Sequence, residues 1–107
     1  MPKRSWQVWG TVLRWIDGDT MVADLDLGWE TWRHGARVRL LGIDAPESRQ
    51  PGGSEATVRA RVLCPVGSVV RVESWRLDSF GRVLGSITLA DGRDLVSALN
   101  DTTKEAP

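Results

Sequence analysis

The feature that most constrains the fold is a series of short segments with strand periodicity, each closed by a turn signal. In the clearest of them, Met21, Ala23 and Leu25 lie two residues apart, which is the spacing of one face of a β-strand. Asp-Gly pairs and other runs containing Gly or Pro separate the segments, as expected where a chain reverses direction. Five such segments are predicted to be strands: 6–16, 20–27, 36–41, 69–75 and 83–89.

Two further segments are predicted to be helical. Residues 54–63 are expected to form a short helix with Ser54 as its N-cap, and Val58 and Val62 lie four residues apart on one face of it. Residues 94–99 form an amphipathic segment, which predicts a short C-terminal helix.

Five turn-linked strands with one helix between the third and the fourth is the order of elements in an oligonucleotide/oligosaccharide-binding (OB) barrel. We therefore expect a β-rich, α+β protein built on a five-stranded OB-fold barrel. A chain of 107 residues has room for one domain, 1–107, with its core at about 6–100, a hairpin loop at 28–35 and a frayed tail at 101–107. This fold serves many functions, so the site residues must carry the functional argument.

Composition argues against several functions. The net charge is zero, unlike that of a protein that binds nucleic acid by overall positive charge alone. The single cysteine, Cys64, cannot form an internal disulfide and is expected to be a part-buried thiol at a helix end. The only histidine, His34, falls in the predicted loop, which argues against a Ser-His or Cys-His hydrolase. No signal peptide or membrane-spanning run is seen, so a cytoplasmic protein without membrane contact is expected.

Two short runs concentrate residues that bind cations and phosphates. They are Asp17-Gly18-Asp19-Thr20 and the nine residues from Arg39 to Glu47, which together hold four carboxylates and one arginine at turns beside apolar segments. Hard cations such as Ca²⁺ prefer oxygen ligands, and the planar guanidinium of arginine matches phosphate oxygens. These runs predict a cation held against a phosphate.

With two further pieces, these runs resemble the staphylococcal-nuclease-like (thermonuclease) family. The further pieces are Gly53-Ser54-Glu55-Ala56 and Asp78-Ser79-Phe80-Gly81-Arg82, and all four occur in the order and approximate spacing of that family over about residues 8–100. The resemblance implies a five-stranded barrel and calcium-dependent hydrolysis of DNA and RNA phosphodiesters. It therefore implies Ca²⁺ as cofactor and DNA and/or RNA as substrate.

The resemblance also implies roles for the carboxylates. Asp19 and Asp44 match the carboxylate ligands of the Ca²⁺, and the backbone carbonyl of Ala45 matches a third ligand, although the family usually has threonine there. Asp17 matches a nearby carboxylate that acts through the waters of the metal. Glu47 matches the general base that activates the attacking water.

Arg39 and Arg82 match the two arginines that grip the scissile phosphate. Charge builds on the phosphoryl oxygens during hydrolysis, so a cation and two guanidinium groups at that point would stabilise it. Further candidates for substrate contact are less specific, because a solvated surface explains the arginines and ordinary packing explains the tryptophans. They are Arg37, Arg49, Arg76, Phe80, Trp29 and Trp32.

Each piece also has a structural interpretation. Asp-Gly pairs are common in hairpin turns, and Arg39 could form a purely structural ion pair with Asp44 or Glu47. For the whole chain, the alternative is a non-catalytic staphylococcal-nuclease-like module that binds nucleic acid or a protein. An accessory protein in DNA packaging or recombination is a third possibility. The six tryptophans, together with a chain shorter than is usual in the family, suit a homodimer.

Overall fold

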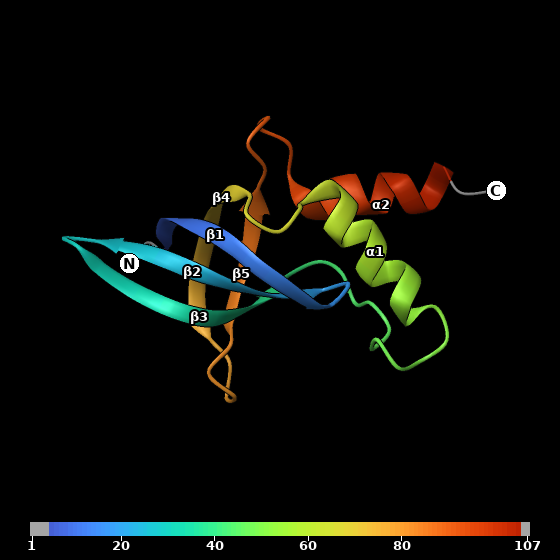
Figure 1. Cartoon of the computed structure of the whole chain (residues 1–107), viewed down its shortest axis with the longest axis horizontal. Helices are drawn as coiled ribbons and strands as arrows, with labels where there is room; N and C mark the ends of the chain where they lie inside the picture. The colour runs from blue at the N-terminus through green and yellow to red at the C-terminus, as the bar shows by residue number, and fades with distance from the viewer. Residues whose placement is uncertain (1–4, 106–107) are drawn as a thin grey trace.

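Five strands form a closed barrel with two helices beside one end of it in the computed structural model, which describes residues 5–105, with side chains to Asp101 (Figure 1). The elements in chain order are β1 (Trp6–Asp17), β2 (Thr20–Gly28), β3 (Thr31–Leu40), α1 (Gly53–Leu63), β4 (Val69–Leu77), β5 (Val83–Thr88) and α2 (Leu95–Glu105). Neighbouring strands follow the order β1-β2-β3-β5-β4, and β4 pairs with β1 to close the barrel. Only β3 and β5 run parallel. The expected β-rich barrel with two short helices is confirmed.

The strands fill the barrel interior with apolar side chains at alternate positions. Each strand contributes a side chain that is at most 1% exposed, as seen for Val12, Met21, Val38, Val72 and Ile87. Since successive side chains of a strand point to opposite faces, Arg37 and Arg39 of β3 lie on the face opposite the buried Val38.

Helix α1 is tied to the barrel at its C-terminal end. The indole Nε1 of Trp15 donates a hydrogen bond to the carbonyl oxygen of Cys64, at 2.9 Å. Cys64 is fully buried, and burial raises the pKa of its thiol to about 11. The cysteine is therefore a structural thiol at the end of the helix, and it is more completely buried than the sequence predicts.

The predicted loop at 28–35 is wrong, because β3 begins at Thr31. Trp29 and Glu30 form a two-residue turn between paired Gly28 and Thr31, and their φ angles are 56° and 57°. His34 therefore lies in a strand, where its Nδ1 is 3.2 Å from a carboxylate oxygen of Asp24. The sequence predicts a loop there because Trp29-Glu30 lacks the Asn-Gly pair typical of two-residue hairpin turns, and because Gly28 and Gly35 bound the segment.

The prediction for the first helix is right in position and wrong in its buried face. Val58 and Val62 are exposed, and the N-cap is Gly52 instead of Ser54. The buried residues of α1 are small, which lets the helix lie close to the barrel: they are Gly53, Ala56, Thr57 and Ala60. A pattern of large apolar residues therefore marks the wrong face here.

The second helix is longer than the sequence predicts. It begins at Leu95 and continues through residues 101–105, where a frayed tail is expected from the sequence. Residues 106–107 of that predicted tail lie outside the described part of the chain. Neither of the two described helices is long and apolar enough to cross a membrane.

Candidate active site

Asp19 connects the β1–β2 turn to the loop that follows β3. Its side chain is 8% exposed, and its Oδ2 accepts a hydrogen bond from the backbone N–H of Ala45 at 2.9 Å. Its Oδ1 accepts one from the hydroxyl of Thr20, and its carbonyl accepts one from the N–H of Leu40. The turn can approach this closely because Gly18 has no side chain: a Cβ there would lie 2.8 Å from the Cβ of Ala56 in α1.

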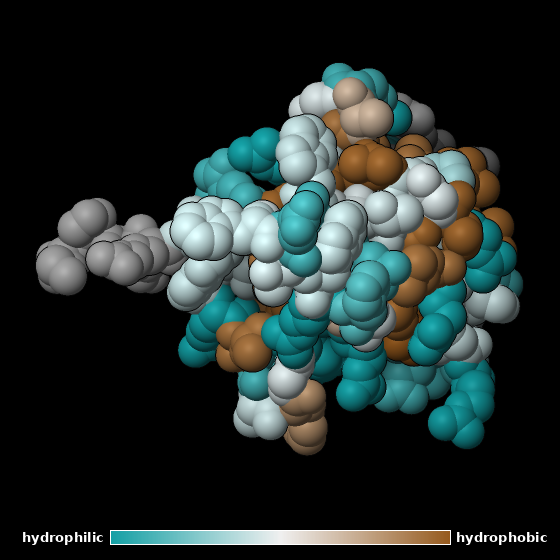
Figure 2. Space-filling view, turned by 60° about the vertical axis from the view of Figure 1, so that its left-hand side comes forward, coloured by the Kyte–Doolittle hydropathy of each residue, from teal (hydrophilic) through white to brown (hydrophobic). Residues whose placement is uncertain are grey.

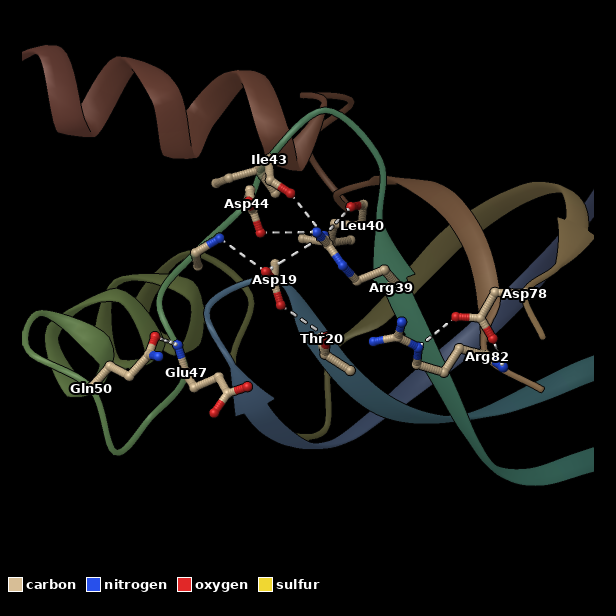
Figure 3. Close-up of polar contacts among 11 residues, drawn as sticks. Asp19, Thr20, Arg39, Leu40, Ile43, Asp44, Glu47, Gln50, Asp78 and Arg82 are labelled. Carbon is tan, nitrogen blue, oxygen red and sulfur yellow. Dashed lines mark hydrogen bonds and ion pairs between the residues drawn. The ribbon is translucent and has the colours of Figure 1, made fainter. Parts of the chain in front are cut away.

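Arg39, near the end of β3, lies between two of the predicted metal-binding carboxylates (Figure 3). Its Nη1 is 3.5 Å from Oδ2 of Asp19, and its Nη2 donates to Oδ1 of Asp44 at 3.3 Å. Nη1 also donates to the carbonyl oxygens of Leu40 and Ile43, at 2.6 and 2.7 Å. The guanidinium is therefore held in one orientation by the loop that it helps to shape.

Asp17, the last residue of β1, contacts the residue that follows Glu47 in the chain. Oδ1 of Asp17 accepts hydrogen bonds from both the N–H and the hydroxyl of Ser48, each at 2.9 Å. The structure thus gives Asp17 a partner that sequence reasoning missed, since nothing in the local pattern pairs residues 31 positions apart. Its outer-shell role remains a prediction.

Glu47 lies in a turn that is fixed by its backbone. Its N–H donates to the side-chain oxygen of Gln50, and its carbonyl accepts from the N–H of Gln50. Gly53 lies so close to that carbonyl that any Cβ there would overlap it. The carboxylate itself is exposed and has no hydrogen-bond or ion-pair partner among the described residues. The backbone is therefore constrained while the carboxylate is free to act.

Arg82 is held in the β4–β5 loop by Asp78. Its Nε donates to Oδ2 of Asp78 at 2.6 Å, and Oδ1 accepts the backbone N–H groups of Phe80 and Arg82 at 2.9 Å. Partial burial opposes ionisation of Asp78, but these hydrogen bonds from Arg82 and Phe80 outweigh it and lower the pKa of the carboxyl. Figure 3 shows the guanidinium extending from the loop toward Thr20 and Arg39.

Like Ser48, Asp78 contacts a predicted site residue but has no role predicted from the sequence. Its signal is an aspartate four residues before an arginine, with a glycine between them, in a short loop. Aspartate in such a turn accepts backbone N–H groups, and here it also orients the arginine. The same pattern could have identified it from the sequence.

The oxygen donors at Asp19 and Asp44 suit a hard cation but make only part of a calcium site. Ca²⁺ takes six to eight oxygen ligands. Among the described side chains, those of residues 5–101, no group of three or more His, Cys, Asp or Glu is placed to hold a metal. The remaining ligands would have to be backbone carbonyls, waters or substrate oxygens, and Ala45 lies beside Asp19 where its backbone could take part.

The other predicted contact residues are spread over the surface. Three of them are exposed arginines, namely Arg37, Arg49 and Arg76. Phe80 is 77% exposed, and the guanidinium carbon of Arg82 lies 5.9 Å from its ring centre. Trp29 and Trp32 belong to the β2–β3 hairpin, which extends away from the helices (Figure 1), so the structure does not bring them to Arg39.

The closed barrel order and the two helices place the chain in the class of OB-like barrels. Residues 37–101, more than half of the chain, match the family model described as "Staphylococcal nuclease homologue". The chain belongs to the staphylococcal nuclease family. The resemblance inferred from the four sequence pieces is therefore confirmed.

Curated relatives carry related names. The chain is 37% identical over 87 residues to an "Uncharacterized endonuclease" of Escherichia coli, a match that covers 80% of this chain and 52% of the relative. It is 40% identical over 78 residues to a "Micrococcal nuclease" of Shigella flexneri, with coverage of 73% and 41%. It is 38% identical over 78 residues to "Protein ParB" of Escherichia coli, with coverage of 73% and 40%. The chain thus spans about half the length, or less, of these relatives.

Proposed function

We propose that this chain is a calcium-dependent nuclease that hydrolyses phosphodiester bonds of DNA and/or RNA. The observation that carries the proposal is that Arg39 contacts the buried Asp19, while Arg82, held by Asp78, and the unpartnered carboxylate of Glu47 are drawn in the same region of Figure 3. These groups come from separate segments of the chain. Membership of the nuclease family and the names of the relatives support nuclease activity.

Glu47 is the general base in this mechanism. Water is a poor nucleophile at neutral pH, and a carboxylate that accepts its proton during attack accelerates hydrolysis by roughly 10²–10⁴. The turn formed with Gln50 and Gly53 fixes the backbone from which the carboxylate extends.

Asp19 and Asp44 would hold the Ca²⁺, with the carbonyl of Ala45 as a further ligand and Asp17 acting through bound water. When bound, the ion stabilises negative charge on the phosphoryl oxygens. Arg39 is already paired with both carboxylates and offsets one of their two negative charges.

Arg39 and Arg82 bind the phosphate from two sides. Each guanidinium can offer two parallel N–H groups to phosphate oxygens, and each is held by a carboxylate that limits its motion. Preorganised donors of this kind stabilise the charge that develops in the transition state. Loss of either arginine should therefore lower kcat more than it weakens ground-state binding.

Hydrolysis of single-stranded DNA and RNA, measured with Ca²⁺, with Mg²⁺ and with a chelator, tests the proposal. We expect activity with Ca²⁺ and none with the chelator. Glu47→Gln should lower kcat by roughly 10²–10⁴, because it removes the proton acceptor and leaves the shape of the side chain. Arg82→Ala should lower it by about 10²–10³, as for other lost transition-state donors.

Two exposed residues on α1 provide matched controls for these variants. Glu55→Gln and Arg61→Ala make the same changes of charge outside the proposed site and should leave kcat unchanged. Full activity in the chelator, or in both site variants, would contradict the mechanism. Binding of nucleic acid without hydrolysis under any condition would instead identify a non-catalytic binding module.

A further inference from the structure

A cavity of about 450 Å³ opens at one end of the barrel, and of the candidate site residues named above only Arg76 lines it. It lies between the start of β1, the β2–β3 hairpin and the base of the β4–β5 hairpin; we call it the mouth pocket. The lining residues used below are Trp6, Leu27, Arg33, Trp75, Arg76 and Val83. Its volume is in the range of pockets that bind small organic groups, and barrel mouths are frequent ligand sites.

The pocket is lined by side chains that point inward at an end of the barrel where the core stops. Trp6 lies on the same face of β1 as Val8, and it is 62% exposed because no further layer covers it. In β4, a bulge leaves Trp75 without a partner between Ser74 and Arg76. Bulges redirect side chains, and here four consecutive residues of β4, 74–77, all line the cavity.

The charges at the mouth pocket are all positive. Arg33 and Arg76 are the charged residues of its lining, which contains no acidic side chain. The guanidinium of Arg76 has no hydrogen-bond or ion-pair partner among the described residues, and that of Arg33 donates only to the carbonyl oxygen of Gly81, at 3.2 Å. Two tryptophan rings beside two available guanidinium groups suit an aromatic ligand that carries negative charge.

The mouth pocket is continuous with the loop that holds Arg82. Leu77 and Val83, the residues at the two ends of that loop, both line the pocket. The hydrogen bond from Arg33 to Gly81 joins the pocket wall to the residue before Arg82. Figure 2 views this side of the molecule and shows brown and white surface between scattered teal side chains, so apolar groups are open to solvent there.

We propose that the mouth pocket binds an unpaired nucleobase of the substrate strand, stacked against Trp6 and Trp75, with adjacent phosphates at Arg33 and Arg76. The inference rests on the proposed function, because the strand that enters the pocket is the one whose phosphate lies at Arg82. Stacking on an aromatic side chain is available to every base, so the pocket would hold single strands without regard to sequence. Double-stranded substrate would bind less tightly, because its bases are already stacked and paired.

The test measures binding of an eight-nucleotide oligothymidylate, and of an abasic octamer with the same phosphates, by isothermal titration in a Glu47→Gln background. Trp75→Leu should weaken binding of the oligothymidylate roughly 5- to 100-fold and leave the abasic octamer unaffected. Arg76→Gln should weaken both ligands and lower the salt slope of log K by about 0.7, the value of one single-strand phosphate contact. Trp9→Leu and Arg71→Gln are matched controls. Trp9 is exposed, Arg71 is half-buried, and the two side chains contact each other outside the pocket.

Three outcomes would overturn the inference. If the wild-type chain hydrolyses DNA but Trp75→Leu and Arg76→Gln bind both octamers as the parent does, the mouth pocket is not a subsite and the proposed function stands. If the chain neither hydrolyses nor binds nucleic acid, both fail. If the indole NMR signals of Trp6 and Trp75 shift with protein concentration and not with added oligothymidylate, the pocket is an interface between two copies. Circular dichroism of each variant checks folding. Because Arg76 is exposed, its replacement leaves the core intact, so the Arg76→Gln result does not depend on core packing.

Discussion

At the scale of single residues, the candidate site depends on carboxylates that orient arginines. Asp19 and Asp44 hold Arg39, and Asp78 holds Arg82 through a 2.6 Å contact. Fully exposed ion pairs contribute little to stability, but the Arg39–Asp19 and Arg82–Asp78 pairs are partly buried. For the candidate site, their importance is that each guanidinium loses rotational freedom before the substrate arrives, which is the condition for strong stabilisation of a transition state.

We predict that Asp78→Asn lowers kcat by about tenfold with little change in KM, because the freed Arg82 still contacts the substrate but is no longer oriented. Steady-state hydrolysis of single-stranded DNA measures this. Asp91→Asn is the matched control: Asp91 holds Nε of Arg93 at 2.7 Å in the same way, away from the site. Equal losses in the two variants would contradict the positioning role.

Because the pKa of Asp78 is lowered in the folded protein, the stability that this residue contributes depends on pH. A carboxylate whose pKa is lower in the folded state stabilises the fold above its unfolded pKa, about 3.8, and loses that contribution as the pH falls through the folded value. The difference in Tm between wild type and Asp78→Asn should therefore shrink between pH 7 and pH 3. A difference that grew on acidification would contradict the assignment.

At the scale of elements, the β2–β3 hairpin has an unusual turn. Trp29 and Glu30 both have positive φ, a conformation that is costly for residues with a side chain. Two-residue hairpin turns with two positive φ values prefer Asn-Gly. The hairpin is therefore maintained by its strand pairing and not by its turn residues.

We predict that replacing Trp29-Glu30 with Asn-Gly raises the free energy of unfolding by about 1 kcal/mol, which corresponds to an increase in Tm of roughly 4–8 °C. Thermal denaturation followed by circular dichroism measures it. Gly92→Ala provides a control of opposite sign, because Gly92 has φ of 90° and open space around it, so only backbone strain is added. Unchanged stability of the Asn-Gly variant would show that the positive φ angles of Trp29 and Glu30 do not destabilise the fold.

At the scale of the whole molecule, the outer surface of the barrel carries exposed tryptophans in one cross-strand row. Trp9 in β1 and Trp32 in β3 are both paired with Asp26 of β2, so all three side chains lie on one face. The two tryptophan residues are 53% and 47% exposed. Exposed apolar surface of this kind often marks an interface, and the homodimer expected from the tryptophan content would place its contact here.

We predict that the apparent mass in sedimentation equilibrium rises with concentration, and that a Trp9→Ser, Trp32→Ser variant stays monomeric because the shared apolar row is lost. Trp6→Ser, at the mouth pocket, should retain self-association. A wild-type chain whose mass is independent of concentration would exclude the dimer.

Much of the fold, and the position of the candidate site in the chain, could be predicted from local sequence signals. Strand periodicity and turn residues identified five strands, and the Asp17–Thr20 and Arg39–Glu47 runs marked the candidate site. The errors arose where packing overrides local pattern. Helix α1 buries Ala56, Thr57 and Ala60 instead of Val58 and Val62, because the close approach of the helix selects small side chains.

The sequence by itself determined the order of the elements, the barrel class and the family, because periodicity, turn chemistry and motif order are all written along the chain. Only the tertiary structure decided which groups meet. It paired Arg39 with both carboxylates, tied Asp17 to Ser48 and Arg82 to Asp78, and left the carboxylate of Glu47 free. It also formed the mouth pocket from three distant segments. These contacts depend on barrel closure, which no local pattern contains.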